Sequence, residues 1–336
     1  MTDISMNQNR NEASPRRAGF RPGTIVTGIV FLTIVVATTT ALTMLFEDLM
    51  PYRPNGPYGF FRPMLIGLFA VLTGWISCNF WLASFGAVSV AIRRRRRPSL
   101  PEQMVGNRLA ILLPIYEEDP QAVEGHIAST LRSLVEQPRL HGCHLFILSD
   151  TRSDEVAREE KRMFETLYHE FADQLCISYR RRKNNIGRKA GNVQDFVEHW
   201  GGAYDYMLVL DADSRMDGAT VARLADELDA DPGLGLIQTW PRPVRAQTLF
   251  GRLQQFAASL YGQQVAAGFA LIMGNAATYW GHNAMIRVRA FAECCGLPAL
   301  PGNAPLGGEI MSHDFVEAAF LRRRDWAVRI LPERLG

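Results

Sequence analysis

Apolar and polar residues alternate along this chain in blocks of very different length. Two long stretches without any charged residue come first, at residues 24–46 and 63–92. Each is long enough to cross a bilayer as a helix, which takes about 20 apolar residues. Beyond residue 108 the apolar runs shorten to strand length and are separated by amphipathic, helix-like stretches. The pattern therefore predicts two transmembrane helices followed by a globular domain.

The charges around the two long stretches predict how they are oriented. Residues 1–23 carry four arginines and residues 93–97 are five more, whereas the segment between the stretches, 47–62, has two basic and two acidic residues. Because basic residues stay on the cytoplasmic side, both flanks are expected in the cytoplasm. A secretory signal peptide is the alternative for the first stretch, but the run is too long and no cleavage site follows it. We expect residues 1–23 to form a disordered cytosolic tail and residues 93–107 a basic linker.

The remaining residues, 108–336, read as an α/β domain. Apolar runs typical of buried strands are separated by segments of helical periodicity, about 120–136 and 154–171. The expected strands are 109–116, 144–149, 175–179 and 206–210. Strands that alternate with helices at this spacing form βαβ units, so the fold class is α/β with a Rossmann-like, mainly parallel sheet.

Acidic and aromatic residues follow three of the expected strands. They are Tyr116-Glu117, Asp150, and the pair Asp211 and Asp213. Ligands of open α/β sheets bind at the carboxyl ends of the strands, so these side chains are expected at one site. Two carboxylates two positions apart suit Mg²⁺ or Mn²⁺ bridging to a diphosphate. A solvated strand-to-helix turn, with one aspartate as a helix cap, is the other interpretation of the pair.

Several classes of nucleotide site are excluded by missing motifs. No G-x-G-x-x-G follows the first strand and no G-x-x-x-x-G-K-[ST] occurs in the chain, which removes the dinucleotide-binding fingerprint and the P-loop. Phosphate charge would then be held by metal and basic side chains. The basic stretch 180–189 is the candidate, with Lys189 at the head of a helix; a solvated cationic loop is the alternative.

The composition argues against a nucleic-acid partner, a zinc site and a disulfide framework. The chain has 36 basic and 34 acidic residues, and its arginine run 93–97 adjoins a membrane stretch, so no nucleic-acid partner is expected. The five cysteines include no C-x-x-C pair. Most lie in apolar context, which is typical of a reduced interior and not of a zinc site or disulfide framework.

Taken together, the motifs resemble a known family. Tyr116-Glu117, Asp150, the Lys189-Ala190-Gly191-Asn192 run and Asp211-Ala212-Asp213 are similar to the GT-A domain of processive family-2 glycosyltransferases, the cellulose-synthase and hyaluronan-synthase group. The segments 279–284 (YWGHNA) and 307–315 (GGEIMSHDF) resemble more closely the glucosyltransferases that make osmoregulated periplasmic glucans in Gram-negative bacteria. The resemblance runs from about residue 24 to the end.

This resemblance implies an activity and a location. The expected protein is an inverting glucosyltransferase of the bacterial inner membrane, with N-terminus and GT-A domain in the cytoplasm and residues 47–62 as a periplasmic loop. UDP-glucose would be the donor, a growing β-glucan the acceptor, and Mg²⁺ or Mn²⁺ the cofactor.

The resemblance also implies residue roles. Tyr116 would stack on uracil, Glu117 and Asp150 would bind ribose and base, and Lys189 and Asp211 would contact the nucleotide. Asp211 and Asp213 would hold the metal, Asp314 would be the general base, and Gly281, His282 and Asn283 would face the acceptor. Other interpretations stay open for two of them: Asp314 as a helix N-cap and His282 as a buried, hydrogen-bonded histidine. These site residues are Tyr116, Glu117, Asp150, Lys189, Asp211, Asp213, His282, Asn283 and Asp314.

Two departures from the family pattern affect what is expected. The usual Thr-Glu-Asp is Ser312-His313-Asp314 here, and no Gln-x-x-Arg-Trp occurs. The sequence therefore resembles the N-terminal portion of a longer protein, with residues 108–336 an incomplete GT-A domain. We expect it to bind UDP weakly with metal and to make no glucan. The alternatives are a haloacid-dehalogenase-type phosphatase with Asp211 as nucleophile, and an inactive membrane scaffold.

Overall fold

The computed structural model describes residues 22–50, 59, 61–93, 104–298, 300–302, 307–308, 310 and 312–332. They divide into two compact units, each with its own contacts. A helical unit contains residues 22–93 and 242–274, and an α/β unit contains residues 104–241 and 275–332. The expected tail at 1–23, the loop at 47–62 and the linker at 93–107 lie largely outside the described residues.

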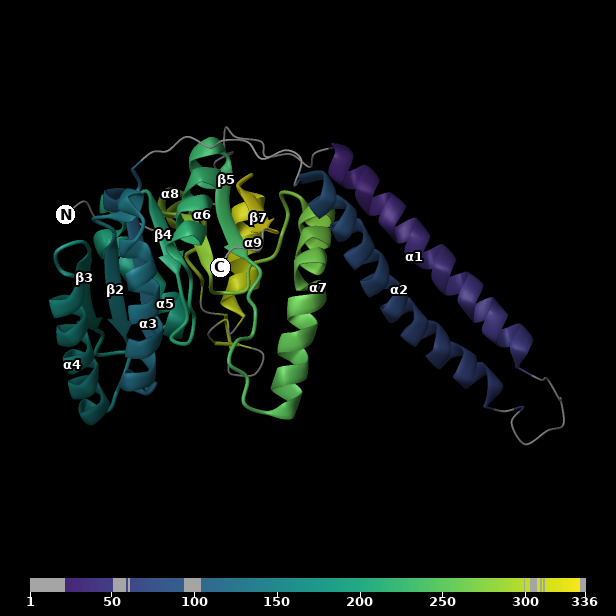
Figure 1. Ribbon diagram of the computed structural model, residues 1–336, viewed down its shortest axis with the longest axis horizontal. Helices are drawn as coiled ribbons and strands as arrows, with labels where there is room; N and C mark the ends of the chain where they lie inside the picture. The colour runs from purple at the N-terminus through teal and green to yellow at the C-terminus, as the bar shows by residue number, and fades with distance from the viewer. Residues whose placement is uncertain are drawn as a thin grey trace. The chain divides into compact units, whose positions relative to one another are not determined.

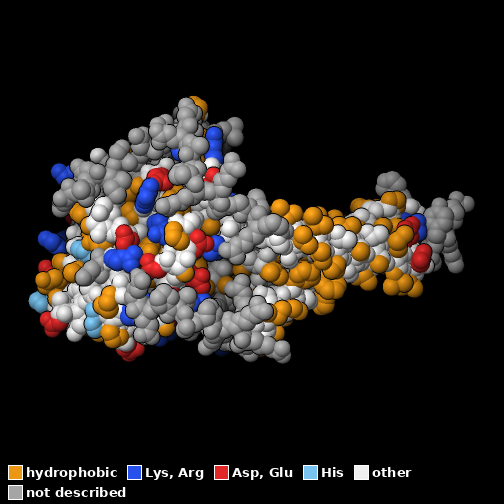
Figure 2. Space-filling model, turned by 90° about the horizontal axis from the view of Figure 1, so that it is seen from above, with side chains coloured by type: hydrophobic (Ala, Val, Ile, Leu, Met, Phe, Trp, Pro, Cys, Tyr) orange, Lys and Arg blue, Asp and Glu red, His pale blue; other side chains and the backbone are white. Residues whose placement is uncertain are grey.

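Three long helices form the helical unit: α1 (Pro22–Leu49), α2 (Arg62–Arg93) and α7 (Leu249–Met273). Helices α1 and α2 cover the two stretches expected to cross the membrane, and Figure 2 shows apolar side chains over most of their outer surface. They are joined by polar as well as apolar contacts, since Nε1 of Trp81 donates to Oγ1 of Thr38 at 3.0 Å. The third helix was not expected. In the described part of the chain, all three are long and apolar enough to span a bilayer.

A seven-stranded sheet forms the centre of the α/β unit, with the order β3-β2-β1-β4-β6-β5-β7. Its strands are β1 (Leu109–Ile115), β2 (His144–Ser149), β3 (Cys176–Arg181), β4 (Tyr206–Val209), β5 (Leu234–Thr239), β6 (Ala284–Arg287) and β7 (Ala327–Leu331). Only β6 runs antiparallel to its neighbours. The α/β class with a mainly parallel sheet is therefore confirmed.

Helices cover the sheet in two groups (Figure 1). The first group is α3 (Pro120–Val135), α4 (Asp154–Phe171) and α6 (Gly218–Ala230), with α3 against both others. The second is α5 (Arg188–Trp200), α8 (Val288–Cys294) and α9 (His313–Arg323), with α8 against both others. Short 3₁₀ turns lie at Gly106–Arg108, Pro138–Leu140 and Gly201–Ala203.

The central strands are buried on both faces, which explains why their sequences show no polar alternation. In β1, Leu109, Ile111 and Leu113 are at most 1% exposed and belong to the main apolar cluster. On β2, Phe146 packs edge-to-face on Phe196 of α5, with ring centroids 4.8 Å apart. Each such side chain contributes roughly 1.5–3 kcal/mol through burial.

The strand order determines where a ligand can bind. Strands β2 and β3 lie on one side of β1 and β4 lies on the other, so the order reverses between β1 and β4. The crevice at such a reversal, at the carboxyl ends of the strands, is the usual ligand site of open α/β sheets. Because β6 is antiparallel and Val209 pairs with Ala284, residues just before β6 reach the same edge as residues just after β4.

Candidate functional site

A cavity of about 910 Å³ lies at the carboxyl edge of the sheet. Five of the residues expected at the site line it: Tyr116, Asp150, Lys189, Asp211 and Asp213. They come from the ends of β1, β2 and β4 and from the first turn of α5. The topology thus brings together side chains that are nearly 100 residues apart in sequence.

The segment after β1 presents Tyr116 to the cavity and turns Glu117 away from it. Tyr116 is 45% exposed, so its ring is accessible to a ligand. Glu117 has a φ of 60°, uncommon for a residue other than glycine. Its carboxylate accepts from the backbone N–H groups of Arg152 and Ser153 at 2.8 and 2.9 Å. Glu117 braces the loop after β2 in this structure, and its role in binding the nucleotide stays a prediction.

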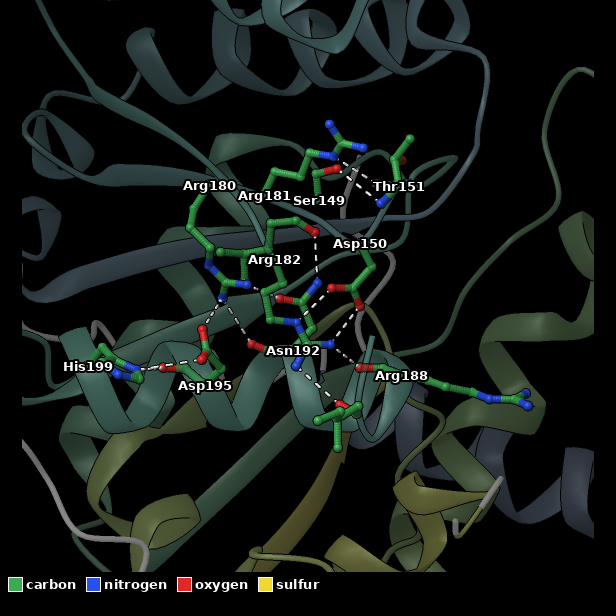
Figure 3. Close-up of polar contacts among 12 residues, drawn as sticks. Ser149, Asp150, Thr151, Arg180, Arg181, Arg182, Arg188, Asn192, Asp195 and His199 are labelled. Carbon is green, nitrogen blue, oxygen red and sulfur yellow. Dashed lines mark hydrogen bonds and ion pairs between the residues drawn. The ribbon is translucent and has the colours of Figure 1, made fainter. Parts of the chain in front are cut away.

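Asp150 is fixed by an arginine. It is only 4% exposed, and Nε and Nη2 of Arg182 donate to its two oxygens at 2.7 and 2.8 Å (Figure 3). The same guanidinium donates to the carbonyls of Ile186 and Arg188. Two parallel charged hydrogen bonds hold a carboxylate in one orientation, so Asp150 faces the cavity without freedom to rotate.

A buried carboxylate stabilises the same turn from behind. Glu160 of α4 is 1% exposed and accepts from the hydroxyls of Ser149 at 2.7 Å, Tyr179 at 2.8 Å and Thr151. Ser149 and Thr151 flank Asp150 in sequence. Burial and the bond to Glu160 raise the pKa of Tyr179 to about 12, so the hydroxyl stays a donor.

The three arginines at the start of the basic stretch are engaged within the protein. Arg180 pairs with Asp195 at 2.8 Å, Arg181 with Asp154 at 2.9 Å, and Arg182 with Asp150 (Figure 3). Arg188 and Lys189 line the cavity instead. Of the stretch proposed as counter-charge for phosphate, the part that faces the cavity is therefore its C-terminal end.

The residues after Lys189 let α5 approach β2 and β3 closely. A Cβ atom on Gly191 would lie 2.0 Å from the carbonyl oxygen of Ile186, so no larger residue fits there. Asn192, 1% exposed, donates to the carbonyl of Leu148 and accepts from Arg180, both at 2.8 Å. These contacts hold the N-terminus of α5, and with it Lys189, at the cavity.

Lys189 connects three parts of the site. Its ammonium contacts Oδ1 of Asp211 and donates to the carbonyl oxygen of Gly281 at 2.8 Å. On the other side of Asp211, Nε2 of His282 lies 3.9 Å from Oδ2. Residues from α5, β4 and the segment before β6 thus converge on one carboxylate.

The donor set suits a divalent cation shared with a ligand. Asp211 and Asp213 both line the cavity, and among the described residues Asp213 has no hydrogen-bond or ion-pair partner. No group of three or more His, Cys, Asp or Glu side chains positioned for a metal occurs within those residues. Mg²⁺ and Mn²⁺ bound by one or two carboxylates complete their shell with phosphate oxygens and water. The site therefore fits such a cation only together with a phosphate-bearing ligand.

The segment before β6 has strained backbone and unpaired polar atoms. Gly281 and Asn283 have φ values of 83° and 50°. Nδ1 of His282 and Oδ1 of Asn283 are buried without a hydrogen-bond partner among the described residues, and Asn283 is 8% exposed. Such strain and unmet hydrogen bonds concentrate at binding sites. The role of His282 on the acceptor side stays a prediction, beside the alternative of a buried, hydrogen-bonded histidine.

Asp314 lies next to the Gly281 segment. A Cβ atom at Gly281 would lie 3.6 Å from Oδ2 of Asp314. The carboxylate of Asp314 is therefore next to Gly281, the residue before His282, and Lys189 donates to the carbonyl oxygen of Gly281. Helix α9 begins at His313 with Ser312 at the N-cap, so Asp314 is in the first turn and is not the cap. An N-cap at Asp314 would require the helix to begin at Phe315, two residues later than it does, so the cap interpretation is wrong.

Behind Asp314, the same helix carries a buried acid. Glu317 is 3% exposed, and burial raises the pKa of its carboxyl above the usual range, partly offset by Nδ1 of His313 at 3.2 Å. The charge of Asp314 raises this pKa further.

Several residues at the site were not expected from the sequence. Glu118, Arg152, Asn185 and Arg188 line the cavity, and burial with the nearby charges of Glu160 and Asp211 raises the pKa of Glu118. Glu118 could have been found, since it follows Tyr116-Glu117 at the end of β1. The partners of Asp150 and Glu117 had no such signal, because each pairing spans more than 30 residues.

Comparison with known proteins identifies related sequences. The model of the family described as Glycosyl transferase family 2 matches residues 110–295, more than half of the chain. Together with the sheet topology, this match confirms the expected GT-A fold. One relative, glucans biosynthesis glucosyltransferase H of Xanthomonas campestris pv. campestris (strain B100), is 39% identical over 336 residues, covering 99% of this chain and 51% of the relative.

A second relative with the same name, from Caulobacter vibrioides (strain NA1000 / CB15N), is 44% identical over 274 residues, or 80% of this chain and 40% of the relative. The chain thus spans about half the length of the curated relatives it matches. Among solved structures, the mannosyltransferase PcManGT from Pyrobaculum calidifontis in complex with GDP-Man and Mn²⁺ is 14% identical, with a TM-score of 0.49 over 75% of this chain and 67% of that chain.

Proposed function

This chain belongs to glycosyl transferase family 2, and from that premise we propose that it is an inner-membrane glucosyltransferase that uses UDP-glucose to extend a β-glucan. The names of the curated relatives support glucose as the sugar and a glucan as the product. The observation that carries the proposal is the convergence of Tyr116, Asp150, Lys189, Asp211 and Asp213 on one cavity at the carboxyl edge of the sheet.

Donor binding is assigned to the β1, β2 and β4 side of the cavity. Tyr116 would stack on the uracil ring, and Asp150, oriented by Arg182, would accept from the base or ribose. Lys189 and Arg188 offer positive charge for the diphosphate. Asp211 and Asp213 would hold Mg²⁺ or Mn²⁺ with the diphosphate oxygens, and that cation would neutralise the UDP leaving group.

Acceptor binding and proton removal are assigned to the other side. His282 and Asn283 have unmet hydrogen-bonding capacity that sugar hydroxyls would satisfy. Asp314, adjacent to Gly281, would take the proton of the attacking hydroxyl as that oxygen bonds to the anomeric carbon. The bond from the anomeric carbon to UDP breaks in the same displacement, so an α-linked donor gives a β-linked product.

The helical unit supports a membrane location. Helices α1 and α2 are expected to form a hairpin whose two ends emerge in the cytoplasm, where UDP-sugars are found. The growing glucan and the lipid bilayer would then be the partners of the chain, together with the donor.

The other hypotheses receive less support. A phosphatase with Asp211 as nucleophile is not favoured, because the chain belongs to a glycosyltransferase family. An inactive scaffold would differ from the glucosyltransferase and from the phosphatase, because it would turn over neither a nucleotide sugar nor a phosphate ester.

One assay separates the three, because an inactive scaffold would neither bind UDP-glucose in a metal-dependent way nor release nitrophenol. Vesicles that contain the chain are incubated with radiolabelled UDP-glucose and Mn²⁺, and in parallel with p-nitrophenyl phosphate; UDP-glucose binding is measured on the same sample. The proposed enzyme binds UDP-glucose only with the metal and releases no nitrophenol. Release of nitrophenol, or donor binding that does not depend on metal, would overturn the proposal. Labelled polymer would refute the expectation that this chain alone makes no glucan.

A further inference from the structure

Two neighbouring loops at the cavity carry the side chains assigned to the nucleoside. Tyr116 follows β1 and Asp150 follows β2, and both line the cavity. One uridine can stack on the first and donate to the second only if the two loops keep a fixed separation. Binding groups need to be held within about 0.5 Å of the productive geometry. The contacts that join the loops therefore bear on nucleotide affinity.

Side chains join the two loops beyond the point where the sheet ends. Among the described residues, the last backbone hydrogen bond between the two segments runs from the N–H of Asp150 to the carbonyl oxygen of Ile115, at 2.9 Å. Further along, the N–H of Glu117 donates to Oγ1 of Thr151 at 3.0 Å. The hydroxyl of Thr151 donates in turn to the buried carboxylate of Glu160, which orients its oxygen as an acceptor. Glu117 is thus attached to a residue that buried contacts hold in place.

The carboxylate of Glu117 makes a second link. Its Oε1 accepts from the N–H groups of Arg152 and Ser153, at 2.8 and 2.9 Å. Ser153 is the N-cap of α4, and the positive end of a helix dipole favours a carboxylate at that place. Both links start from the residue next to Tyr116, so they set the distance from this tyrosine to the loop after β2.

The opposite side of the loop after β2 is attached to β3. Nε of Arg181 donates to the carbonyl oxygen of Thr151 at 2.8 Å, and Nη2 donates to that of Arg152 at 2.9 Å. A cation therefore binds carbonyl groups of the loop, and Glu117 binds its N–H groups. Since Arg181 holds the loop to β3, it does not replace Glu117 as the connection to β1.

Glu117 has a backbone conformation that separates its side chain from that of Tyr116. Its φ of 60° is left-handed, which is uncommon for a residue with a Cβ atom. Tyr116 lines the cavity, whereas Glu117 is not among the residues around it. Strained backbone persists where the surrounding structure imposes it, and it concentrates at binding sites. At Glu117 the two links to the loop after β2 impose it.

We propose that Glu117 is a positioning residue of the nucleotide site: it locks the loop after β2 to the loop after β1, so that Tyr116 and Asp150 meet the same nucleoside. The carboxylate acts through the backbone of Arg152 and Ser153 and makes no contact with the ligand. This role replaces the contact with ribose or base that the family resemblance implies. The inference rests on the nucleotide binding proposed above.

Two substitutions at Glu117 separate the acceptor oxygen from the charge. Glu117→Gln keeps an oxygen in the same place and removes the charge, whereas Glu117→Met has a similar length and no such acceptor. UDP binding to the full chain with Mn²⁺ is measured by calorimetry, at a temperature well below the Tm of each variant. Glu117→Gly, which lacks the acceptor and suits a φ of 60°, takes the place of the methionine variant if that does not fold.

A second ligand separates positioning from a contact with the ribose. 2′,3′-Dideoxy-UDP lacks both ribose hydroxyls that a carboxylate could bind. We expect Glu117→Met to weaken the binding of UDP and of the dideoxy analogue by the same factor, about ten-fold. Glu117→Gln should stay within about two-fold of the wild-type affinity for both ligands, because its oxygen still accepts from the loop.

Three results would overturn the inference while leaving the nucleotide site intact. Unchanged UDP affinity in Glu117→Met would make the residue structural only. A loss for UDP without a loss for the dideoxy analogue would show a direct contact with the ribose. Equal losses in the glutamine and methionine variants would assign the effect to charge. A wild-type chain that binds no UDP would contradict the proposed function, and this inference with it.

Discussion

At the amino edge of the sheet, Arg108 lies between Asp205 and Asp229, and the hydroxyl of Tyr206 donates to Asp229 at 2.6 Å. At the carboxyl edge, Asp213 has no partner among the described residues, and polar atoms of His282 and Asn283 are buried without one. Both edges carry acids and bases. At the first edge, acids and bases pair within the protein and hold strands to helices, although Oδ2 of Asp229 is buried without a hydrogen-bond partner among the described residues. At the second, Asp213 lines the cavity and its carboxylate is open to a ligand. The comparison predicts that changes at one edge affect stability and at the other affect function.

The largest expected effect is at Asp314. Asp314→Asn keeps the shape of the side chain but removes the proton acceptor, so glucosyl transfer should fall by about 10²–10⁴-fold, the usual contribution of a general base. Because we expect no glucan from this chain alone, transfer is measured with radiolabelled UDP-glucose in a full-length context, and UDP affinity should not change. Asp325→Asn, just beyond the other end of α9, is the matched control. Equal transfer by both variants would contradict the assignment.

The next largest effect is expected at Lys189, which connects Asp211 to Gly281. Lys189→Met should weaken UDP binding by roughly 10–100-fold, the equivalent of one charged hydrogen bond of about 1.5–3 kcal/mol. Lys161→Met, an exposed lysine on α4, removes the same charge away from the cavity and should have no effect. Calorimetric titration compares them; the same affinity for both variants would show that Lys189 is structural.

At the amino edge the expected effect is on folding alone. Tyr206 is 1% exposed, and Tyr206→Phe removes the donor to Asp229. The free energy of unfolding should fall by about 1 kcal/mol, which lowers Tm by roughly 2–4 °C in a unit of this size. Tyr168→Phe, 47% exposed, should leave Tm unchanged. A loss of UDP affinity in Tyr206→Phe would erase the distinction between the two edges.

A further effect is expected on the pH dependence of stability. His144 on β2 is hydrogen-bonded to Tyr204 at 2.7 Å and Ser178 at 2.8 Å, and burial lowers its pKa from 6.5 to about 4. Between these values the unfolded chain binds a proton that the folded chain does not. Stability should therefore decrease as the pH falls from about 6.5 to about 4. His144→Gln, measured by denaturant unfolding, should flatten this decrease; an unchanged slope would assign it to other groups.

Strands β1, β2 and β4 could be predicted from sequence because each contains an unbroken apolar run that is followed by a polar residue. Strand β3 is shorter in apolar residues and was predicted from its place between two helical segments. The same reasoning located Tyr116, Asp150, Asp211 and Asp213 at one edge, since parallel strands present their carboxyl ends together. Asp314 and His282 were predicted as site residues from the family resemblance alone. Their positions relative to Asp211 depend on β6, a strand of four residues whose antiparallel direction leaves no local signal.

Other features could not be predicted for different physical reasons. In α7 the apolar residues follow helical spacing and are interrupted by Arg252 and several glutamines, so the segment lacks the long continuous run that marked α1 and α2. The basic stretch 180–189 contains several side chains that could pair with Asp150. Only the approach of β3 to β2 selects Arg182 for Asp150 and leaves Lys189 for Asp211.

The central claim is that the cavity at the carboxyl edge binds a nucleotide diphosphate together with a divalent cation. Calorimetric titration of the chain with UDP tests it, with Mn²⁺, with EDTA, and in Asp213→Ala with Mn²⁺. Asp213 is exposed and has no hydrogen-bond or ion-pair partner among the described residues, so the substitution should not disturb the fold. We predict binding by the wild-type chain with Mn²⁺, and none with EDTA or in the variant. The same UDP affinity in all three titrations would contradict the account.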